Sequence, residues 1–350
     1  MPPPIRVDGA KIMTTSFSGI RLLGTGAYLP GDPVGNDDVV AMLPAGATTS
    51  EWIAEHTGIV ERHYAPATEA TSDLAAAAAR HALAAAGLEA DQLEHLILCT
   101  TTSDWTSPAA ASRVQALIGA SCPAEDKQVA CASWLFGLDH GARLCATGKS
   151  AVMVIGADVK SRFVDPADHR LRPVLADGAA AVILGRGPKD GTGLRAVHLM
   201  SDGTKALNMY TPAGGSAMPA SAQTVADGLH RVHMAVGGQQ IKADAIAIMA
   251  GAVRLLLTDI GWGLDDVDLL IGHQANLAIL RGLADELGVG MERVPVTIDR
   301  TGNIVAATLP FTLDEVLRSG RVAPGARVIL TTAGAGYAGG AAAFEFPHAA

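Results

Sequence analysis

GLDDVDLLIGH, at residues 263–273, repeats the pattern of GLEADQLEHLILC at residues 87–99, with a gap of two residues. In both copies a glycine-leucine pair and acidic residues lead into an apolar run that is typical of a buried strand. Three further pairs of segments match in the same order, namely residues 136–139 with 311–314, 148–154 with 325–330, and 178–181 with 340–343. We interpret these matches as two copies of one unit.

The repeat divides the chain into two halves. We expect a flexible tail over residues 1–18, an N-terminal half over 19–185 and a C-terminal half over 186–350. In the first half, expected strands at 20–24, 93–100, 151–155 and 179–184 alternate with expected helices at 72–86 and 133–147. This alternation predicts a layered α/β fold. Because a solenoid needs about three repeats, we expect a pseudo-twofold pair of halves that share one core.

The composition is that of a globular protein with a large core. Hydrophobic residues make up 49% of the 350 residues and charged residues 17%, which excludes extended disorder. No apolar run reaches the roughly 20 residues that span a bilayer. The net charge is −9 without a cluster of Lys or Arg, so we expect neither a nucleic-acid nor a membrane partner. We expect the 39 glycines at strand-to-helix turns and in one loop near a site.

The four cysteines are Cys99, Cys122, Cys131 and Cys145. Their spacing contains neither a CxxC pair nor a zinc pattern, so we expect no metal site and no tightly bound cofactor. Four cysteines in a chain of this length are typical of reduced thiols in the cytosol. The first residues contain no apolar stretch of a secretory signal. The sequence therefore predicts a cytoplasmic protein.

Cys131 lies where an apolar strand leads into a helix. A thiol at a helix N-terminus meets unpaired N–H groups and the positive end of the dipole, which would lower its pKa and make it nucleophilic. The alternative is a small buried cysteine that fills a gap in the core.

His273 ends a buried strand, where it is placed to move a proton or simply to form a structural hydrogen bond. Asn303 follows Gly302 and is equally compatible with an ordinary turn or N-cap. Strand ends of α/β sheets collect at one face, where ligands bind. We therefore expect Cys131, His273 and Asn303 to converge near the pseudo-twofold axis.

Residues 334–339 fit the pattern GxGxxG, but only 11 residues follow, which leaves no room for the helix and acidic residue of a dinucleotide site. We interpret this segment as a loop that presses backbone N–H groups against a reacting carbonyl.

Together these segments resemble the type III β-ketoacyl-acyl-carrier-protein synthases of the thiolase superfamily. The resemblance covers nearly the whole chain after about residue 19. The matching pieces are residues 50–53, 56–59, 61–63, 128–134, 177–179, 272–277, 302–303 and 334–340. This resemblance implies a five-layered αβαβα thiolase fold and a homodimer.

The resemblance also implies a catalytic triad of Cys131, His273 and Asn303, with the N–H groups of Cys131 and Ala335 as oxyanion hole. A coenzyme A thioester would be the substrate, and Trp52 would stack on its adenine. The other coenzyme A contacts implied are His56, His169, Arg170, Gly238 and Asn276. The residues implied for the acyl or acceptor pocket are Ser107, Ser133, Trp134 and Ala333.

Several residues depart from the family pattern. His56 stands where many relatives have an Arg that contacts the nucleotide, and a second such Arg falls near His169, with Arg170 adjacent. The helix after His273 carries Ala278, Asp285 and Glu286 where relatives have basic residues, with Arg281 as partial compensation. Acidic residues that face an acidic carrier protein cost affinity, so we expect docking of acyl carrier protein to be disfavoured. Ser107 and Ala333 replace Phe and would widen the pocket.

These departures favour the ketosynthase-III-like acyltransferases of natural-product pathways, such as the cervimycin malonyltransferase. In that hypothesis an acyl group, for example malonyl, passes from an acyl-CoA to Cys131. It then moves to a hydroxyl of a small-molecule acceptor such as a sugar of a glycosylated polyketide, with His273 as general base. The alternative is a decarboxylative β-ketoacyl-acyl-carrier-protein synthase III, which condenses acyl-CoA with malonyl-acyl carrier protein. A third hypothesis is a catalytically silent partner subunit.

Overall fold

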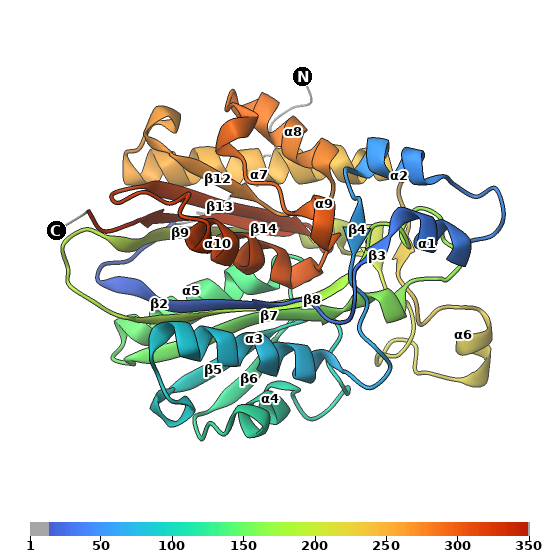
Figure 1. The fold of residues 1–350 in the computed structure, drawn as a ribbon, viewed down its shortest axis with the longest axis horizontal. Helices are drawn as coiled ribbons and strands as arrows, with labels where there is room; N and C mark the ends of the chain where they lie inside the picture. Colours follow the sequence, from blue (N-terminus) through green and yellow to red (C-terminus); the bar gives the residue numbers. More distant parts are fainter. Residues whose placement is uncertain (1–13, 349–350) are drawn as a thin grey trace.

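Two five-stranded mixed sheets form the centre of the molecule (Figure 1). The computed structural model describes residues 14–348. The first sheet has the order β2-β8-β7-β5-β6, with bounds Ile20–Tyr28, Asp177–Arg186, Ala151–Val159, His95–Cys99 and Ala124–Lys127. The second sheet has the order β1-β9-β14-β13-β12, with bounds Thr15–Ser16, Gly193–Ser201, Ala338–Glu345, Arg327–Gly334 and Leu269–Gly272.

The strands β9, β14, β13 and β12 repeat the arrangement of β2, β8, β7 and β5. In each set the first three strands pair antiparallel and the last two pair parallel. This shared order and pairing is what a duplication of one unit produces. The end of β5 at Cys99 and the end of β12 before His273 are equivalent positions in the two sheets.

Helices cover both sheets and fill the space between them (Figure 1). Helices α3 (Thr71–Ala86) and α4 (Ala111–Ile118) pack on the outer face of the first sheet. Helices α5 (Ser133–Ala146) and α10 (Thr308–Arg318) lie between the sheets and contact strands of both. Helix α7 (Gly238–Ile260) packs on the outer face of the second sheet, beside α8 (Leu277–Leu287). The predicted five-layered αβαβα arrangement is confirmed.

The two central helices carry the same ion pair at the same place. In α5 the Arg143 Nε donates to Asp139 at 2.7 Å, and in α10 the Arg318 Nε donates to Asp314 at 2.7 Å. These aspartates end the matching segments 136–139 and 311–314 that the sequence repeat contains. The repeat is therefore visible in side-chain contacts as well as in strand order.

The shorter elements lie mainly at one end of the sheets. They are β3 (Val34–Gly35), α1 (Asn36–Met42), α2 (Ser50–Thr57), β4 (Glu61–Arg62), β10 (Met209–Tyr210), α6 (Ala222–Ala226), β11 (His233–Met234) and α9 (Ile298–Thr301). Six short 3-10 helices complete the described part, and they are η1 (Ala90–Gln92), η2 (Lys160–Phe163), η3 (Gly203–Asn208), η4 (Leu264–Asp266), η5 (Met291–Arg293) and η6 (Val305–Ala307). Within residues 14–348, every helix is too short or too polar to cross a membrane.

The predicted tail over residues 1–18 is too long at its C-terminal end. Thr15 and Ser16 form β1, which pairs antiparallel with β9 of the second sheet. Residues 1–13 lie outside the described residues. The boundary between 185 and 186 stays a prediction, and it falls at the end of β8.

Several glycines permit close packing of helix on sheet, a role beyond the turns that the sequence predicts for them. A Cβ atom on Gly26 of β2 would lie 2.4 Å from the backbone N of Ala82 in α3. A Cβ atom on Gly24 would lie 2.5 Å from the backbone O of the same alanine. The alanine-rich face of α3 therefore rests directly on the backbone of β2.

We predict that the same substitution, glycine to alanine, has opposite effects on stability at two positions. Gly26→Ala forces a methyl group against a backbone atom and should cost about 1–3 kcal/mol. Gly251→Ala in α7 meets no atom within 4 Å and should stabilise by up to about 1 kcal/mol. The midpoint of thermal unfolding, followed by circular dichroism, should fall for the first variant and rise for the second. A rise for Gly26→Ala would contradict the close contact.

Candidate active site

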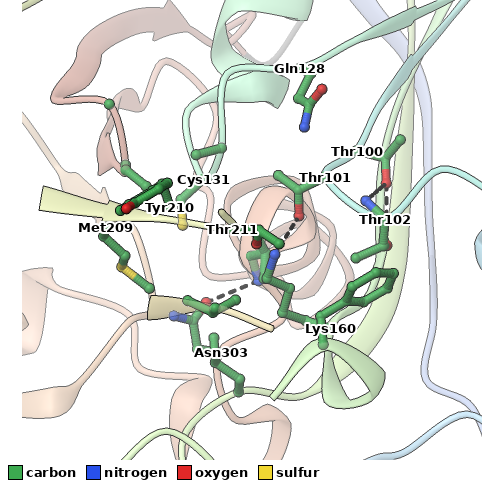
Figure 2. Close-up of a pocket in the computed structure, with 18 of the residues that line it drawn as sticks. Thr100, Thr101, Thr102, Gln128, Cys131, Lys160, Met209, Tyr210, Thr211 and Asn303 are labelled. Atoms are coloured by element: carbon green, nitrogen blue, oxygen red, sulfur yellow. Dashed lines mark hydrogen bonds between the residues drawn. The ribbon is translucent and has the colours of Figure 1, made fainter. Parts of the chain in front are cut away.

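A cavity of about 1610 Å³ lies beyond the ends of strands from both sheets. Its wall includes residues that directly follow β5, β7 and β12, namely Thr100, Lys160 and His273. Cys131 and Asn303 line the same cavity, and Figure 2 shows both around it. The structure thus brings together the three residues that the sequence selects as a triad.

Cys131 sits in a strained turn at the start of α5. The residue before it, Ala130, has a φ of 48°, in the left-handed region that non-glycine residues rarely adopt. The Cys131 side chain is half-buried, whereas the other three cysteines are buried. The turn therefore exposes this thiol to the cavity, and strained backbone of this kind clusters at functional sites.

Burial raises the pKa of the Cys131 thiol to about 12, and the charge of Asp158 adds to this. The charge of Lys160 and the backbone N–H groups of Cys131 and Ala335 act in the opposite direction. The prediction of a lowered pKa at the helix end is therefore wrong for this protein. Desolvation of the thiolate outweighs the favourable N–H groups, so the resting thiol keeps its proton at neutral pH.

The loop after β13 presses against the backbone of Cys131. A Cβ atom on Gly334 would lie 2.8 Å from the Cys131 N and 3.0 Å from the Ala132 N. The absence of a side chain at Gly334 allows this approach and brings the Ala335 N–H within hydrogen-bond reach of the thiol. Tyr337, at the other end of the loop, donates its hydroxyl proton to Asp244 at 2.7 Å. The loop is therefore held at both ends.

His273 is 3% exposed, and its Nδ1 lies 2.6 Å from the Thr308 Oγ1. Burial lowers the pKa of His273 to about 4, so the ring is neutral at pH 7. The Thr308 hydroxyl also lies 3.1 Å from the Val305 carbonyl O. When that hydroxyl donates to Val305, Nδ1 carries the proton and Nε2 is an acceptor; when it donates to Nδ1, Nε2 is a donor. Thr308 thus serves either tautomer.

Asn303 is held by its backbone and by its side-chain oxygen. Its N donates to the Val174 O at 2.8 Å, and its O accepts from the Ala176 N at 3.0 Å. The side-chain Oδ1 accepts from the Val305 N at 2.9 Å, which sets the orientation of the amide. Among the described residues, the Nδ2 group has no hydrogen-bond partner of its own, so its N–H donors are available to a molecule in the cavity.

A second strained turn follows Asn303. Val305 has a φ of 53°, which is a true outlier for a β-branched residue. Val305 lies six residues before Phe311, as Ala130 lies six residues before Phe136. Each half of the molecule therefore supplies one strained turn to the cavity, one beside Cys131 and one beside Asn303.

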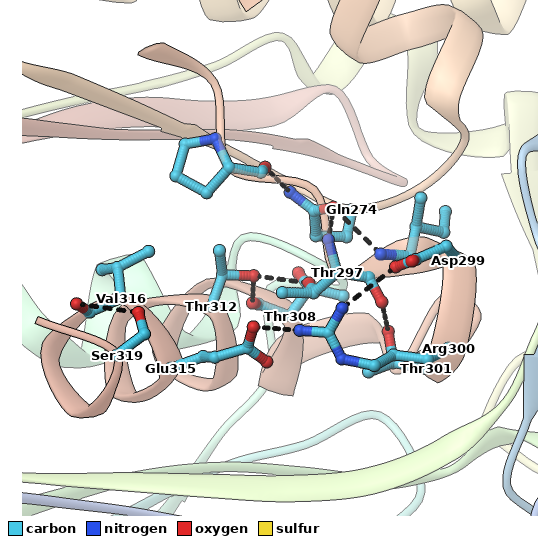
Figure 3. A network of polar contacts seen from close by, with 12 residues as sticks. Gln274, Thr297, Asp299, Arg300, Thr301, Thr308, Thr312, Glu315, Val316 and Ser319 are labelled. Atoms are coloured by element: carbon cyan, nitrogen blue, oxygen red, sulfur yellow. Dashed lines mark hydrogen bonds and ion pairs between the residues drawn. The ribbon is translucent and has the colours of Figure 1, made fainter. Parts of the chain in front are cut away.

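A polar network anchors the segment around His273 (Figure 3). The fully buried Gln274 accepts from the N of Thr297 and of Ile298 at 3.0 and 3.2 Å, and donates to the carbonyl groups of Gly272 and Pro295 at 2.9 and 3.2 Å. All hydrogen-bonding positions of this amide are used within the protein, so Gln274 positions its neighbour and has no free group for a ligand.

Two charged residues of the site are absent from the sequence predictions. Asp158, at the end of β7, is fully buried, and its Oδ1 accepts from the N and Oγ1 of Thr101 at 2.8 and 2.7 Å. Lys160 lines the cavity, and its Nζ donates to the Thr101 Oγ1 at 3.2 Å (Figure 2). The sequence contains a signal for both residues, because Asp158 is the penultimate residue of a buried strand and Lys160 directly follows that strand.

The predicted coenzyme A contacts fall into two groups. Arg170, Gly238 and Asn276 line the cavity, whereas Trp52, His56 and His169 do not. Trp52 is 43% exposed, and its ring stacks on that of His56 with centroids 4.4 Å apart. The Asn276 side chain caps α8 through the Ala278 N at 2.7 Å and donates to the His56 O at 3.2 Å. The stacked pair on α2 is thus tied to a residue of the cavity wall.

Three of the four residues predicted for the acyl or acceptor pocket lie elsewhere. Trp134 is fully buried in the core, where its Nε1 donates to the Val154 O at 3.3 Å. The Ser133 hydroxyl closes the turn before α5 by accepting from the Val129 N and donating to the Ala130 O. Ser107 does not line the cavity, although its neighbour Pro108 does. Ala333 alone lines it as predicted.

Within residues 14–348 no group of three or more His, Cys, Asp or Glu side chains is arranged to hold a metal ion. The chemistry that the cavity supports from its own residues is nucleophilic: a protonated thiol, a neutral imidazole and an amide with free N–H donors. Backbone N–H groups beside the thiol can stabilise an oxyanion.

The pKa of Cys131 predicts slow alkylation with a steep pH dependence. Between pH 7 and 10 the rate with iodoacetamide should rise about tenfold per pH unit, because the thiolate fraction rises with pH below its pKa. At pH 8 Cys131 should react about 100-fold more slowly than an exposed cysteine. Mass spectrometry of the intact protein measures both, with Cys131→Ala as control. A rate that levels off near pH 8 would contradict the raised pKa.

Comparison with known proteins identifies the family. Residues 126–203 match the family 3-oxoacyl-acyl-carrier-protein synthase III, and residues 257–346 match its C-terminal family. The chain is 37% identical over 329 residues to the beta-ketoacyl-acyl-carrier-protein synthase III of Symbiobacterium thermophilum, covering 93% of this chain and 98% of the relative. A Streptomyces coelicolor relative named beta-ketoacyl-acyl-carrier-protein synthase III 3 is 38% identical over 93% of this chain and 97% of its own length.

A solved structure shows the same arrangement. The crystal structure of the 3-oxoacyl-acyl-carrier-protein synthase III of Pseudomonas aeruginosa matches with a TM-score of 0.85 and 35% identity, over 95% of this chain and 99% of that one. The fold is therefore the thiolase fold that the sequence resemblance implies. The chain belongs to the 3-oxoacyl-acyl-carrier-protein synthase III family of the thiolase superfamily.

Proposed function

We propose that this protein is a decarboxylative β-ketoacyl-acyl-carrier-protein synthase III, which condenses an acyl-CoA primer with malonyl-acyl carrier protein. The observation that carries the proposal is the convergence of Cys131, His273 and Asn303 on one cavity in a member of this family. An intact set of these three groups argues against a catalytically silent partner subunit.

The hypothesis of acyl transfer to a small-molecule hydroxyl is wrong. Relatives that are 36–38% identical over at least 90% of the chain are named β-ketoacyl-acyl-carrier-protein synthases, which is the activity of the alternative hypothesis. The small residues Ser107 and Ala333 were an argument for a bulky acceptor, but Ser107 does not line the cavity.

The expectation that acyl carrier protein is disfavoured is also corrected. The names of the relatives contain this carrier as substrate. On α8, the Glu286 carboxylate pairs with Arg254 of α7 at 2.9 Å. The guanidinium also donates to the Glu286 backbone O at 2.6 Å, so this carboxylate is partly neutralised. At Glu286 the negative charge expected on this helix is therefore paired with a cation.

In the loading step, the Cys131 Sγ attacks the carbonyl carbon of the acyl-CoA thioester. The thiol proton passes to the Nε2 of neutral His273, which accepts it while Thr308 holds Nδ1. The N–H groups of Cys131 and Ala335 stabilise the oxyanion. The bond from the carbonyl carbon to the coenzyme A sulfur then breaks, and the proton on His273 moves to the departing sulfur. Loading therefore yields acyl-Cys131 and free coenzyme A.

In the condensation step, malonyl-acyl carrier protein loses CO2, and the electrons of the broken C–C bond form an enolate. The Asn303 Nδ2 donates to the enolate oxygen, and His273 donates from Nε2 in its second neutral tautomer. The enolate carbon attacks the acyl carbonyl of acyl-Cys131, a new C–C bond forms, and the Cys131 sulfur leaves. Its thiolate takes a proton from solvent because the pKa of the thiol is high.

Acyl-CoA would approach along Arg170, Gly238 and Asn276 on the cavity wall. The exposed Trp52 and His56 stack would then meet the nucleotide end, since aromatic faces stack on bases. We propose no tightly bound cofactor. The homodimer that the family resemblance implies stays a prediction.

Loading is tested by incubating the protein with acetyl-CoA and weighing it intact. An acetyl adduct should form on the native protein and be absent from Cys131→Ala, while Cys122→Ala serves as control for removal of a cysteine. Addition of malonyl-acyl carrier protein should remove the adduct, release CO2 and give a β-ketoacyl carrier protein. An acetyl adduct that malonyl-acyl carrier protein leaves unchanged, or condensation by Cys131→Ala, would refute the proposal.

The loop at Gly334 provides a second prediction. Gly334→Ala places a methyl group 2.8 Å from the Cys131 N, which should push the Ala335 N–H away from the thioester oxygen. Removal of one oxyanion donor typically costs about 10²-fold in rate, so acylation should slow by about that factor with little change in acyl-CoA affinity. Gly203→Ala, with no atom within 4 Å, is the matched control. Equal acylation rates for the two variants would exclude this role of the loop.

A further inference from the structure

We propose that Lys160, held in place by Thr101, binds a carboxylate at the far end of the acyl group that Cys131 receives, so that the enzyme selects an acyl-CoA primer that ends in a carboxylate. This inference rests on the proposed function, because it assigns the substrate class of the same cavity.

Lys160 begins η2 directly after β7 and faces the cavity that Cys131 lines (Figure 2). Its ammonium group is close enough to the thiol for its charge to lower the pKa of Cys131. Because Cys131 and Lys160 line the same cavity, a group attached to the Cys131 sulfur can extend toward the ammonium group. The Phe163 ring, 5.7 Å from Nζ, and hydroxyl groups of residues 100–103 form the surrounding wall.

The ammonium group uses a small part of its hydrogen-bonding capacity. Nζ donates to the Thr101 Oγ1 at 3.2 Å, whose own proton goes to the Asp158 Oδ1 at 2.7 Å. Within residues 14–348 no carboxylate lies within ion-pair distance of this ammonium. A lysine ammonium has three donors, so two of them remain for a molecule in the cavity. An incompletely paired charge on a largely buried side chain is costly, and an anionic ligand would relieve that cost.

Asp158 does not accept the free donors of Lys160, because other N–H and O–H groups of the protein already donate to it. Its Oδ1 accepts from the N and Oγ1 of Thr101 and from the Thr102 Oγ1, and its Oδ2 accepts from the Ala306 N at 3.1 Å. The negative charge of Asp158 nevertheless opposes the lowering of the Lys160 pKa by burial. Asp158 therefore helps Lys160 stay charged without occupying its free donors.

Two arginines and one histidine of neighbouring segments use their donors elsewhere. Arg162 donates to the carbonyl groups of Pro66 and Glu69, both at 2.7 Å, and does not line the cavity. Arg170 lines the cavity, but its exposed guanidinium lies 3.4 Å from Asp168. The His63 Nδ1 bonds to the Pro30 O at 3.0 Å. Among the described residues that line the cavity, Lys160 is therefore the only lysine or arginine with free donors beside Cys131.

The carboxylate of the primer fits this position better than that of the malonyl extender. The extender carboxylate must leave as CO2, and an ammonium paired with it would stabilise the ground state and slow decarboxylation. A carboxylate at the far end of the primer undergoes no chemistry, so pairing with Lys160 adds affinity and selectivity without that penalty.

The test compares two acyl-CoA substrates of equal chain length, glutaryl-CoA and pentanoyl-CoA, which differ by a carboxylate in place of a methyl group. The loading rate of Cys131 is measured for each by intact-protein mass, without carrier protein. The native enzyme should load glutaryl-CoA faster. In Lys160→Met the ratio of glutaryl to pentanoyl loading should fall at least about tenfold, because a charge-assisted hydrogen bond is lost.

Further variants define the outcomes. Lys160→Arg should keep part of the preference, Thr101→Val should reduce it, and Lys189→Met, an exposed lysine, should leave it unchanged. A native preference for pentanoyl-CoA overturns the inference even where Lys160→Met does not fold. An equal slowing of both substrates in Lys160→Met overturns it as well, because Lys160 would then act on the thiol.

A measurement of the condensation step distinguishes binding of the primer carboxylate from binding of the malonyl extender. A Lys160→Met effect confined to the KM for malonyl-acyl carrier protein, measured on pentanoyl-loaded enzyme, would assign the ammonium to the extender and overturn the primer assignment. Absence of loading with glutaryl-, pentanoyl- and acetyl-CoA on the native enzyme would overturn the proposed function together with this inference. Loading of the neutral substrates alone would leave the proposed function standing and refute only the carboxylate site.

Discussion

The burial of helices α5 and α10 between the two sheets is the contact on which the rest of the molecule depends. Each helix fills the same place in its half, with Leu138 and Leu313 fully buried in one shared core. Each begins at a turn with a positive φ, at Ala130 and at Val305. Packing of the helices against both sheets holds these turns in conformations that an isolated chain would avoid. One turn presents the nucleophile candidate, and the other orients the amide of Asn303.

Burial of Cys131 and His273 determines the proton chemistry of the site. Burial lowers the pKa of His273 and raises that of Cys131, so both groups are neutral at rest. A neutral pair avoids the cost of two buried charges, and a proton can move from sulfur to nitrogen when a thioester arrives. Thr308 supports either tautomer of the ring, which suits a histidine that acts first as acceptor and then as donor. At Lys160 burial also lowers the pKa, and the charge of Asp158 opposes that lowering.

Much of the fold and part of the site could be predicted from local patterns. The matching segments around residues 93–99 and 267–273 anticipate the equivalent strands β5 and β12, and the turn before α5 marks Cys131. The prediction that Trp134 lines the pocket was wrong. The sequence of a helix indicates which residues are apolar, but it does not indicate which apolar face packs on a sheet and which lines a cavity. The ion pair of Glu286 could not be predicted from the sequence, because its partner, Arg254, comes from another helix.

The sequence by itself determined the repeated α/β unit, the family, and the candidate residues Cys131, His273 and Asn303, because periodicity and short motifs depend on neighbours along the chain. Only the tertiary structure decided the raised pKa of the thiol, the burial of Trp134 and the position of Lys160 beside Cys131. These properties depend on how much water and which charges surround a group. That surrounding is created when segments distant in the chain pack together, as β7, α5 and the loop after β13 do here.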